Sequence, residues 1–301
     1  MRNPPVHWAE GMFLKPHHFQ AAERFWSEQM ATSDQWDHQY NYGVRQIEFS
    51  REALENQQLQ VHLLHARMKD GSLISIDPGQ EPDRVDLKES FMDLSEALVD
   101  LTDAFANETK IRVYLAVPKL KMGVENVSRA NADNASHHRY MEIEHEIQDE
   151  SSGGNDHAVQ FKSARVKLLL STQDLAGYEL LPIAQIERAG EGGAVPHIDE
   201  DYFPPMLAVD AWKDLGRGIV RAIYDVIGKR LEVLSENIVN RGKSLPTTEP
   251  GDMIRVLMLN RLNEAYGALS VLAFAPGVHP FDAYTELCRI VGQLAIFGDA
   301  R

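Results

Sequence analysis

The apolar residues of this chain change their spacing near residue 200, and this change restricts the folds that the chain can adopt. Over residues 215–238 they recur every three or four positions, which is the spacing of an amphipathic α-helix. Val220, Val226 and Val233 widen the apolar face, so we expect this helix to have neighbours on two sides, within the chain or in other copies. Residues 252–274 and 281–297 predict two further helices.

Before residue 200 the apolar residues follow the shorter period of β-strands. Such segments occupy residues 42–50, 59–68, 71–77, 111–118, 139–147, 158–171 and 178–189. They are joined by turns such as Asp70-Gly71, which favours a tight hairpin. The sequence therefore predicts an α+β chain, with an antiparallel β-sandwich followed by an all-α helical bundle.

Three segments within the strand region need separate interpretation. In residues 139–147 Met141, Ile143, His145 and Ile147 alternate with polar residues, which predicts one buried and one exposed face. Residues 86–105 carry apolar residues at steps of three and four, which indicates an amphipathic helix; an extended loop with apolar anchors is the alternative. Residues 148–156 are polar and glycine-rich, as in an exposed hairpin loop.

Composition excludes several classes of function. The 301 residues carry a formal net charge of -15, which disfavours a nucleic-acid backbone and an anionic membrane surface as partners. Cys288 is the single cysteine, so no internal disulfide forms. The sequence shows neither a secretory signal nor an apolar run of about 20 residues, so we expect a cytoplasmic protein.

The sequence gives little support to catalysis or to a cofactor. Adjacent histidines such as His17-His18 and His137-His138 diverge by about 100° on a helix, and no zinc spacing is present. Glu142, Glu144 and Glu146 could pair as carboxylates, but an exposed, charged sheet face explains them better. The glycines at 190–193 fit a hairpin turn better than a phosphate loop. We predict no enzyme, no cofactor and no metal.

Three motifs occur together in the order and spacing of one known family. They are "WAEGMFLKPHHFQ" (8–20), "HIDEDYFPPML" (197–207) and "HPFDAYTELCRIVGQLAIF" (279–297). Over its whole length the chain resembles the TssK family, also called ImpJ or VasE, the trimeric baseplate proteins of the bacterial type VI secretion system. The positions of the first motif that match the family are Trp8, Glu10, Gly11, Phe13, Leu14, Pro16, His18, Phe19 and Gln20.

The resemblance implies an architecture and partners. Family members have a β-sandwich shoulder, similar to that of phage receptor-binding proteins, then a helical neck and a C-terminal head. The shoulder joins the wedge proteins TssF and TssG, and the head contacts TssJ, TssL and TssM. For this chain we expect a docking segment at 1–20, a shoulder at 21–200 and a neck at 201–301, with the head missing. The expected function is that of a homotrimeric structural adaptor at the inner face of the cell envelope, without direct membrane insertion.

The same resemblance suggests which residues make these contacts. The expected partner-binding residues are Trp8, Glu10, Gly11, Met12, Phe13, Leu14, Pro16 and Phe19. The expected trimer-interface residues are Leu215, Ile219, Ile223, Ile227 and Leu234. In the alternative interpretation, the apolar residues of the first motif only cover the base of the sandwich. A rival function is a carbohydrate-binding module or hydrolase that uses Glu142, Glu144 or His145.

Overall fold

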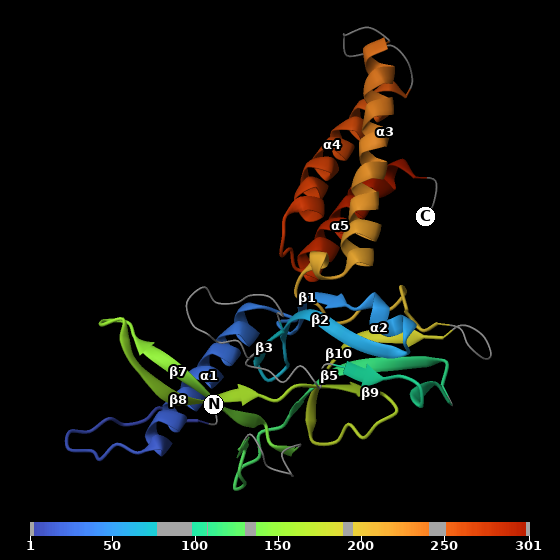
Figure 1. The fold of residues 1–301 in the computed structure, drawn as a ribbon. Coiled ribbons are helices and arrows are strands. Elements are labelled where there is room, and N and C mark those ends of the chain that lie inside the picture. The colour runs from blue at the N-terminus through green and yellow to red at the C-terminus, as the bar shows by residue number, and fades with distance from the viewer. Residues whose placement is uncertain are drawn as a thin grey trace. The chain divides into compact units, whose positions relative to one another are not determined.

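The computed structural model describes residues 3–76, 98–106, 108–129, 137–188, 195–240 and 251–298. The chain divides into a sandwich unit, Met1–Pro205, and a helical unit, Met206–Arg301. The sandwich unit holds antiparallel sheets, and the helical unit holds long helices (Figure 1). This mixture of antiparallel sheet and helix is the α+β fold that the change of apolar spacing predicts.

Two four-stranded antiparallel sheets form the body of the sandwich unit. The first has the order β1-β2-β3, and β4 also pairs with β2; the second has the order β11-β10-β5-β9. The strands of the first are β1 (Gly43–Phe49), β2 (Gln58–Arg67), β3 (Leu73–Ile76) and β4 (Leu98–Asp100). Those of the second are β5 (Lys110–Pro118), β9 (Lys167–Leu170), β10 (Tyr178–Glu187) and β11 (His197–Ile198).

The core of this unit lies between the two sheets. Alternate residues of β2, β3 and β9 are buried, and β5 is buried continuously from Leu115 to Pro118. Figure 1 shows β1 and β2 stacked on β5, β9 and β10. Completely buried side chains of both sheets include Leu59, Leu64, Ile111, Leu115, Leu181, Ile183 and Ile186. The sandwich is therefore closed by side chains of its own strands.

A third sheet projects from the sandwich as an arm. We call β7 (Tyr140–Asp149) and β8 (Gly154–Ala164) the arm; β6 (Val127–Ser128) pairs with the start of β7. The loop at 150–153 joins the two strands as an exposed hairpin, as the sequence predicts. No residue of β7 is buried, so the alternation of 139–147 does not produce a buried face. Among the described residues the arm lacks a second layer, and Ile143 remains only half-buried.

The longest helix of the sandwich unit is one that the periodicity argument missed. α1 spans Pro16–Asp37 and begins with proline, which suits the first turn of a helix because it needs no N–H donor there. None of its residues is buried. Ion pairs hold it instead, from Asp34 to Arg67 on β2 and from Glu23 to Lys162 on the arm. A short helix, α2 (Arg51–Glu55), begins where the Ser50 hydroxyl accepts a hydrogen bond from the Ala53 N–H at 3.2 Å.

Two predicted elements differ from the structure. The single strand expected at 158–171 is two strands, because the chain leaves the arm at Ala164 and enters the second sheet at Lys167. The helix expected at 86–105 is wrong for the described part: Leu98–Asp100 is strand β4, and only the turn at Ala104–Ala106 is helical. Pairing with β2 decides the conformation at 98–100. Residues 86–97 and the glycine-rich turn at 190–193 lie outside the described residues.

The helical unit contains the three predicted helices. A π-helical segment, Asp214–Val220, continues into α3 (Arg221–Asn240), and α4 (Asp252–Phe274) and α5 (Pro280–Leu294) follow. The His279 ring accepts a hydrogen bond from the Phe281 N–H at 3.1 Å and so caps α5. The buried core between the helices consists of Ile227, Leu231, Leu234, Leu262, Ala265, Leu269 and Ile290. None of the described helices has the length and apolarity that crossing a bilayer requires.

Candidate interaction surfaces

The N-terminal motif lies on the surface of the sandwich unit. The Trp8 ring packs on that of Phe19, with 6.1 Å between centroids, and on that of His18, with 6.3 Å. Trp8 is nevertheless 52% exposed and Phe13 is 79% exposed. Gly11 turns the chain at a φ of +79°, where only glycine is unstrained. Trp8 therefore packs with His18 and Phe19, and Trp8, Phe13 and Phe19 stay largely exposed rather than covering the sandwich core.

The second of the two adjacent histidines, His18, has a structural role. The Nδ1 atom of His18 accepts a hydrogen bond from the Lys15 N–H at 3.2 Å, at the start of α1. A side chain that accepts from a free N–H at this place stabilises the first helical turn. Among the described residues, no three His, Cys, Asp or Glu side chains come together as a metal site.

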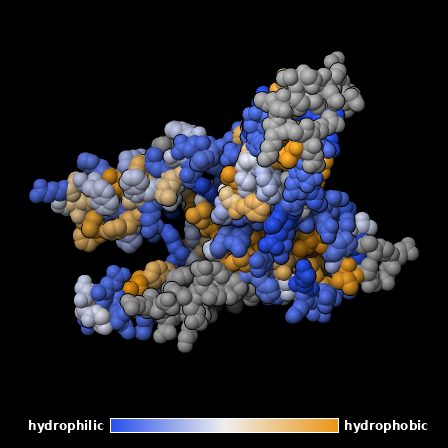
Figure 2. Space-filling view, turned by 90° about the horizontal axis from the view of Figure 1, so that it is seen from above, coloured by the Kyte–Doolittle hydropathy of each residue, from blue (hydrophilic) through white to orange (hydrophobic). Residues whose placement is uncertain are grey.

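An apolar stripe runs along α1 from the motif. Phe19, Trp26 and Met30 are more than half exposed, and Glu23 lies between them on the same face, at steps of four, three and four. Sequence reasoning overlooked Trp26 and Met30, although their spacing from Phe19 carried the signal. In the space-filling view, apolar residues reach the surface among hydrophilic ones (Figure 2). We call Phe19, Trp26 and Met30 the α1 stripe.

The residues expected at a trimer interface lie mostly inside the helical unit. Ile227 and Leu234 are buried against α4 and α5, and Ile223 packs on the same cluster. Leu215 packs on a smaller cluster of this unit, whereas Ile219 is exposed. Four of the five predicted side chains therefore pack inside the helical unit. Apolar residues that could contact another copy must lie on the opposite face of the helix.

That other face is apolar as well. On α3 the exposed residues Val226 and Val233 are seven positions apart, a spacing that keeps side chains on one line of an α-helix. On α5, Phe281, Tyr284 and Val291 form a second exposed line. Each helix thus has one apolar side directed into the unit and one directed outward.

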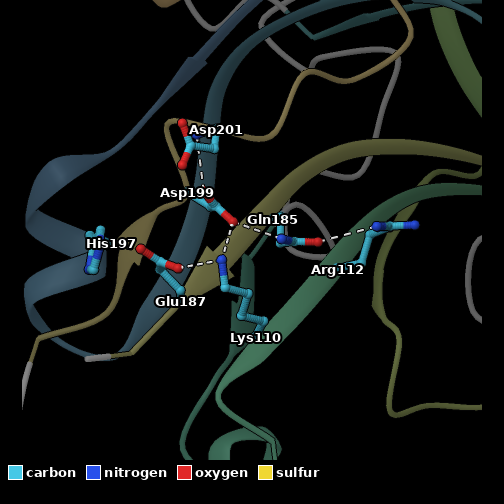
Figure 3. Close-up of polar contacts among 7 residues, drawn as sticks. All are labelled: Lys110, Arg112, Gln185, Glu187, His197, Asp199 and Asp201. Carbon is cyan, nitrogen blue, oxygen red and sulfur yellow. Dashed lines mark hydrogen bonds and ion pairs between the residues drawn. The ribbon is translucent and has the colours of Figure 1, made fainter. Parts of the chain in front are cut away.

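The second motif is held by a polar network at the edge of the second sheet (Figure 3). The carboxylate of Asp199 accepts hydrogen bonds from Lys110 Nζ at 2.8 Å, from Gln185 Nε2 at 2.7 Å and from the Asp201 N–H at 3.0 Å. Lys110 also pairs with Glu187, which contacts His197 at 3.0 Å. The network joins β5, β10 and β11 to the residues that follow them.

The charges of this network stabilise one another. The hydrogen bond from Lys110 is the main cause that lowers the pKa of the Asp199 carboxyl, and Gln185 adds to it. Burial acts in the opposite direction and is outweighed. Downstream, the Pro205 carbonyl accepts a hydrogen bond from the Val44 N–H at 2.9 Å. The second motif therefore fastens the last residues of the sandwich unit onto its sheets.

We expect Asp199→Asn to lower the melting temperature of the sandwich unit by roughly 2–8 °C at pH 7, because Lys110 loses its charged partner. Since the folded pKa of Asp199 is lowered, its stabilising effect is present above the ordinary pKa and is lost as the pH falls through the folded value. Thermal unfolding at pH 7 and at pH 3 measures both effects, and the variant should approach the parent at the lower pH. An equal difference at both pH values would contradict the assignment.

The residues of the rival carbohydrate or hydrolase function do not converge. Glu142 and Glu144 lie on one face of β7, opposite Lys162 and Gln160 of β8. His145 lies on the other face, where its ring contacts that of Phe161 at 5.9 Å between centroids. The strand thus places the imidazole and the two carboxylates, the candidate groups of the rival function, on opposite faces.

The chain is similar over nearly its whole length to a known protein. A curated relative from Pseudomonas aeruginosa (strain PAO1), "Type VI secretion system baseplate component TssK1", is 24% identical over 300 residues, which cover 98% of this chain and 62% of that protein. The chain therefore spans less than two thirds of the length of this relative.

Solved structures share the fold. A crystal structure of TssK has a TM-score of 0.80 at 23% identity, with 98% of this chain and 62% of that chain covered. A chain of the TssK-TssF-TssG baseplate subcomplex, determined by cryo-electron microscopy, has a TM-score of 0.78 at 22% identity, with 100% and 90% covered. A chain of a type VI secretion baseplate complex has a TM-score of 0.81 at 23% identity, with 100% and 64% covered.

A family model supplies the assignment. The model described as "Bacterial Type VI secretion, VC_A0110, EvfL, ImpJ, VasE" matches residues 18–301, nearly the whole chain. The match includes both the sandwich unit and the helical unit. The chain therefore belongs to the ImpJ/VasE family of bacterial type VI secretion proteins, the TssK family.

Proposed function

We propose that this chain is a structural adaptor of the type VI secretion baseplate, which docks through its sandwich unit onto the wedge proteins TssF and TssG. The observation that carries the proposal is the exposure of Trp8, which packs on Phe19, and of Phe13 in the same N-terminal motif. Aromatic residues exposed together on an ordered surface are typical of protein interfaces. The related TssK chain in the TssK-TssF-TssG subcomplex supports the choice of partner.

We also propose the division of the chain, its location and its other partners by analogy with these relatives. We place residues 1–20 in the docking surface, 21–200 in the shoulder and 201–301 in the neck, and we place the protein in the bacterial cytoplasm at the inner face of the envelope. Contact with TssJ, TssL and TssM is assigned to the part of the longer relatives that this chain does not span. No nucleic acid and no membrane insertion are part of this function.

The docking proposal is tested by the double variant Trp8→Ala/Phe13→Ala. Because both side chains are largely exposed, we expect the melting temperature to change by less than about 2 °C. Co-purification with TssF and TssG should fall at least tenfold, since aromatic anchors dominate interface energies. Met122→Ala, which truncates another exposed apolar residue of the same unit, is the matched control. Unchanged co-purification of the double variant would refute the docking surface.

We also propose that the chain forms a homotrimer through the outward faces of its helices. The exposed lines of α3 and α5 support this, because long apolar lines on ordered helices are costly to leave in water. Light scattering at micromolar concentration should give three times the mass of one chain. Val226→Glu/Val233→Glu should give a monomer, whereas Val124→Glu, at an exposed valine of the sandwich unit, should not. A monomeric parent protein would refute the trimer.

A further inference from the structure

The arm and α1 form the two walls of a groove in the sandwich unit. Glu23 lies within the α1 stripe, and its carboxylate pairs with the ammonium group of Lys162 on the arm. Lys162 stands directly opposite Glu142 in the register of β7 and β8. Because neighbouring residues of an antiparallel pair share a face, the Glu142 face of the arm is directed toward the α1 stripe. Figure 2 shows a hollow between two projections at this end of the molecule.

The wall contributed by α1 is apolar and open. Trp26 is 64% exposed and Met30 is 67% exposed, although both lie on a helix held at two points by ion pairs. Phe19 belongs to this wall and also contacts Trp8, so the groove is continuous with the proposed docking surface. The wall is therefore ready to receive apolar side chains without a rearrangement of its own backbone.

The wall contributed by the arm is acidic. Glu142, Glu144 and Glu146 follow one another on the same face of β7, and the last two are exposed. Only Lys162 compensates them on that face, since Gln160 and Ala158 stand opposite Glu144 and Glu146. From residue 140 to residue 161 the chain has six carboxylates and neither lysine nor arginine. Within a protein of net charge -15, this strand pair concentrates negative charge at one place.

We propose that this groove binds an amphipathic segment of a partner protein, with apolar side chains against the α1 stripe and lysines or arginines against Glu144 and Glu146. Charge complementarity selects this occupant, because an acidic segment or an anionic membrane is repelled by the arm. The inference rests on the proposed docking onto TssF and TssG and names the chemistry of the segment that they present. The acidic wall accelerates association, and the apolar wall retains the segment.

The test measures association and dissociation rates of the purified TssF–TssG complex on the intact chain, at about 50 and 300 mM salt. Glu144→Gln/Glu146→Gln should lower the association rate about tenfold at low salt and flatten its salt dependence. Trp26→Ala should raise the dissociation rate about tenfold with little effect on the salt dependence. All three side chains are exposed, so the variants are expected to fold, and circular dichroism checks this.

Matched controls lie outside the groove. Glu55→Gln/Glu108→Gln removes two other exposed carboxylates of the sandwich unit, and Trp36→Ala removes a tryptophan that α1 exposes away from the stripe. If the groove variants bind like the parent, or no differently from these controls, the groove is overturned while the docking proposal stands. If only Trp26→Ala weakens binding, the basic character of the occupant is overturned. If the parent chain does not bind TssF–TssG, the docking proposal fails and the groove fails with it.

Discussion

Replacing Arg139 by alanine is expected to destabilise the sandwich unit by about 3 kcal/mol. The guanidinium is almost completely buried, and it donates hydrogen bonds to Asp70 Oδ2 at 2.7 Å, to Ser72 Oγ at 2.6 Å and to the Pro118 carbonyl at 2.9 Å. It therefore ties the β2–β3 hairpin and the end of β5 to the base of the arm. Truncation leaves the Asp70 carboxylate without its charged partner, and we take the low end of the usual cost because Asp70 is 30% exposed.

Urea unfolding at pH 7 measures this loss, and a cycle with Asp70→Asn isolates the pair. Arg112→Ala is the matched control: its exposed guanidinium contacts Gln185 at 3.2 Å, and its removal should cost no more than about 1 kcal/mol. Arg139→Lys should fall between parent and alanine variant, because an ammonium keeps the charge but not the fork of donors. If Arg139→Ala costs no more than the control, the arginine does not hold the arm.

The contribution of this pair should also depend on pH. Burial alone would raise the pKa of Asp70, but the Ser72 N–H and the Arg139 charge outweigh it and lower that pKa from its usual 3.8. Because the folded pKa is the lower one, the stabilisation is present at neutral pH and is lost as the pH falls through the folded value. Parent and Asp70→Asn should therefore converge in stability as the pH falls below the ordinary value of 3.8 and through the lower, folded one.

How far the fold can be read from the sequence depends on which interactions decide each element. The helix predicted at 252–274 coincides with α4, because the preceding "SLPTTEPGD" marks its start and the apolar segment that follows favours a helix. α1 was missed although Phe19, Trp26 and Met30 have helical spacing, because the helix buries none of its residues and Glu23 interrupts this short apolar stripe. The split at 164–167 was missed although the sequence marks it, because the apolar alternation shifts there by one residue, from Val159 and Phe161 to Val166 and Leu168, and the two strands join different sheets.

The candidate surfaces were predictable to a different degree. The exposed position of Trp8 and Phe13 agrees with a docking role, but their sequence could not distinguish surface from core, since both use the same residue types. The helix at 215–238 carries apolar residues on two sides, and only packing shows that Ile227 and Leu234 face inward while Val226 and Val233 face outward. The acidic wall opposite the α1 stripe depends on a contact between residues 23 and 162, which no local pattern encodes.

Leu269→Ala is expected to destabilise the helical unit by about 2–5 kcal/mol. Leu269 is completely buried on α4, among residues of α3 and α5, so its truncation removes apolar contacts and leaves a cavity. Urea unfolding followed by circular dichroism at 222 nm should show an earlier helical transition. Val271→Ala, two residues away and 58% exposed, should cost less than about 0.5 kcal/mol in an isolated chain.

The comparison of these two variants at several protein concentrations separates packing within the chain from packing between copies. The cost of Leu269→Ala should change little with concentration, because its contacts lie within one chain. If the outward side of α4 also contacts another copy, the cost of Val271→Ala should rise with protein concentration, since association stabilises the folded chain by mass action. A small cost of Leu269→Ala at every concentration would show that the buried cluster between α3, α4 and α5 is not what holds the helical unit together.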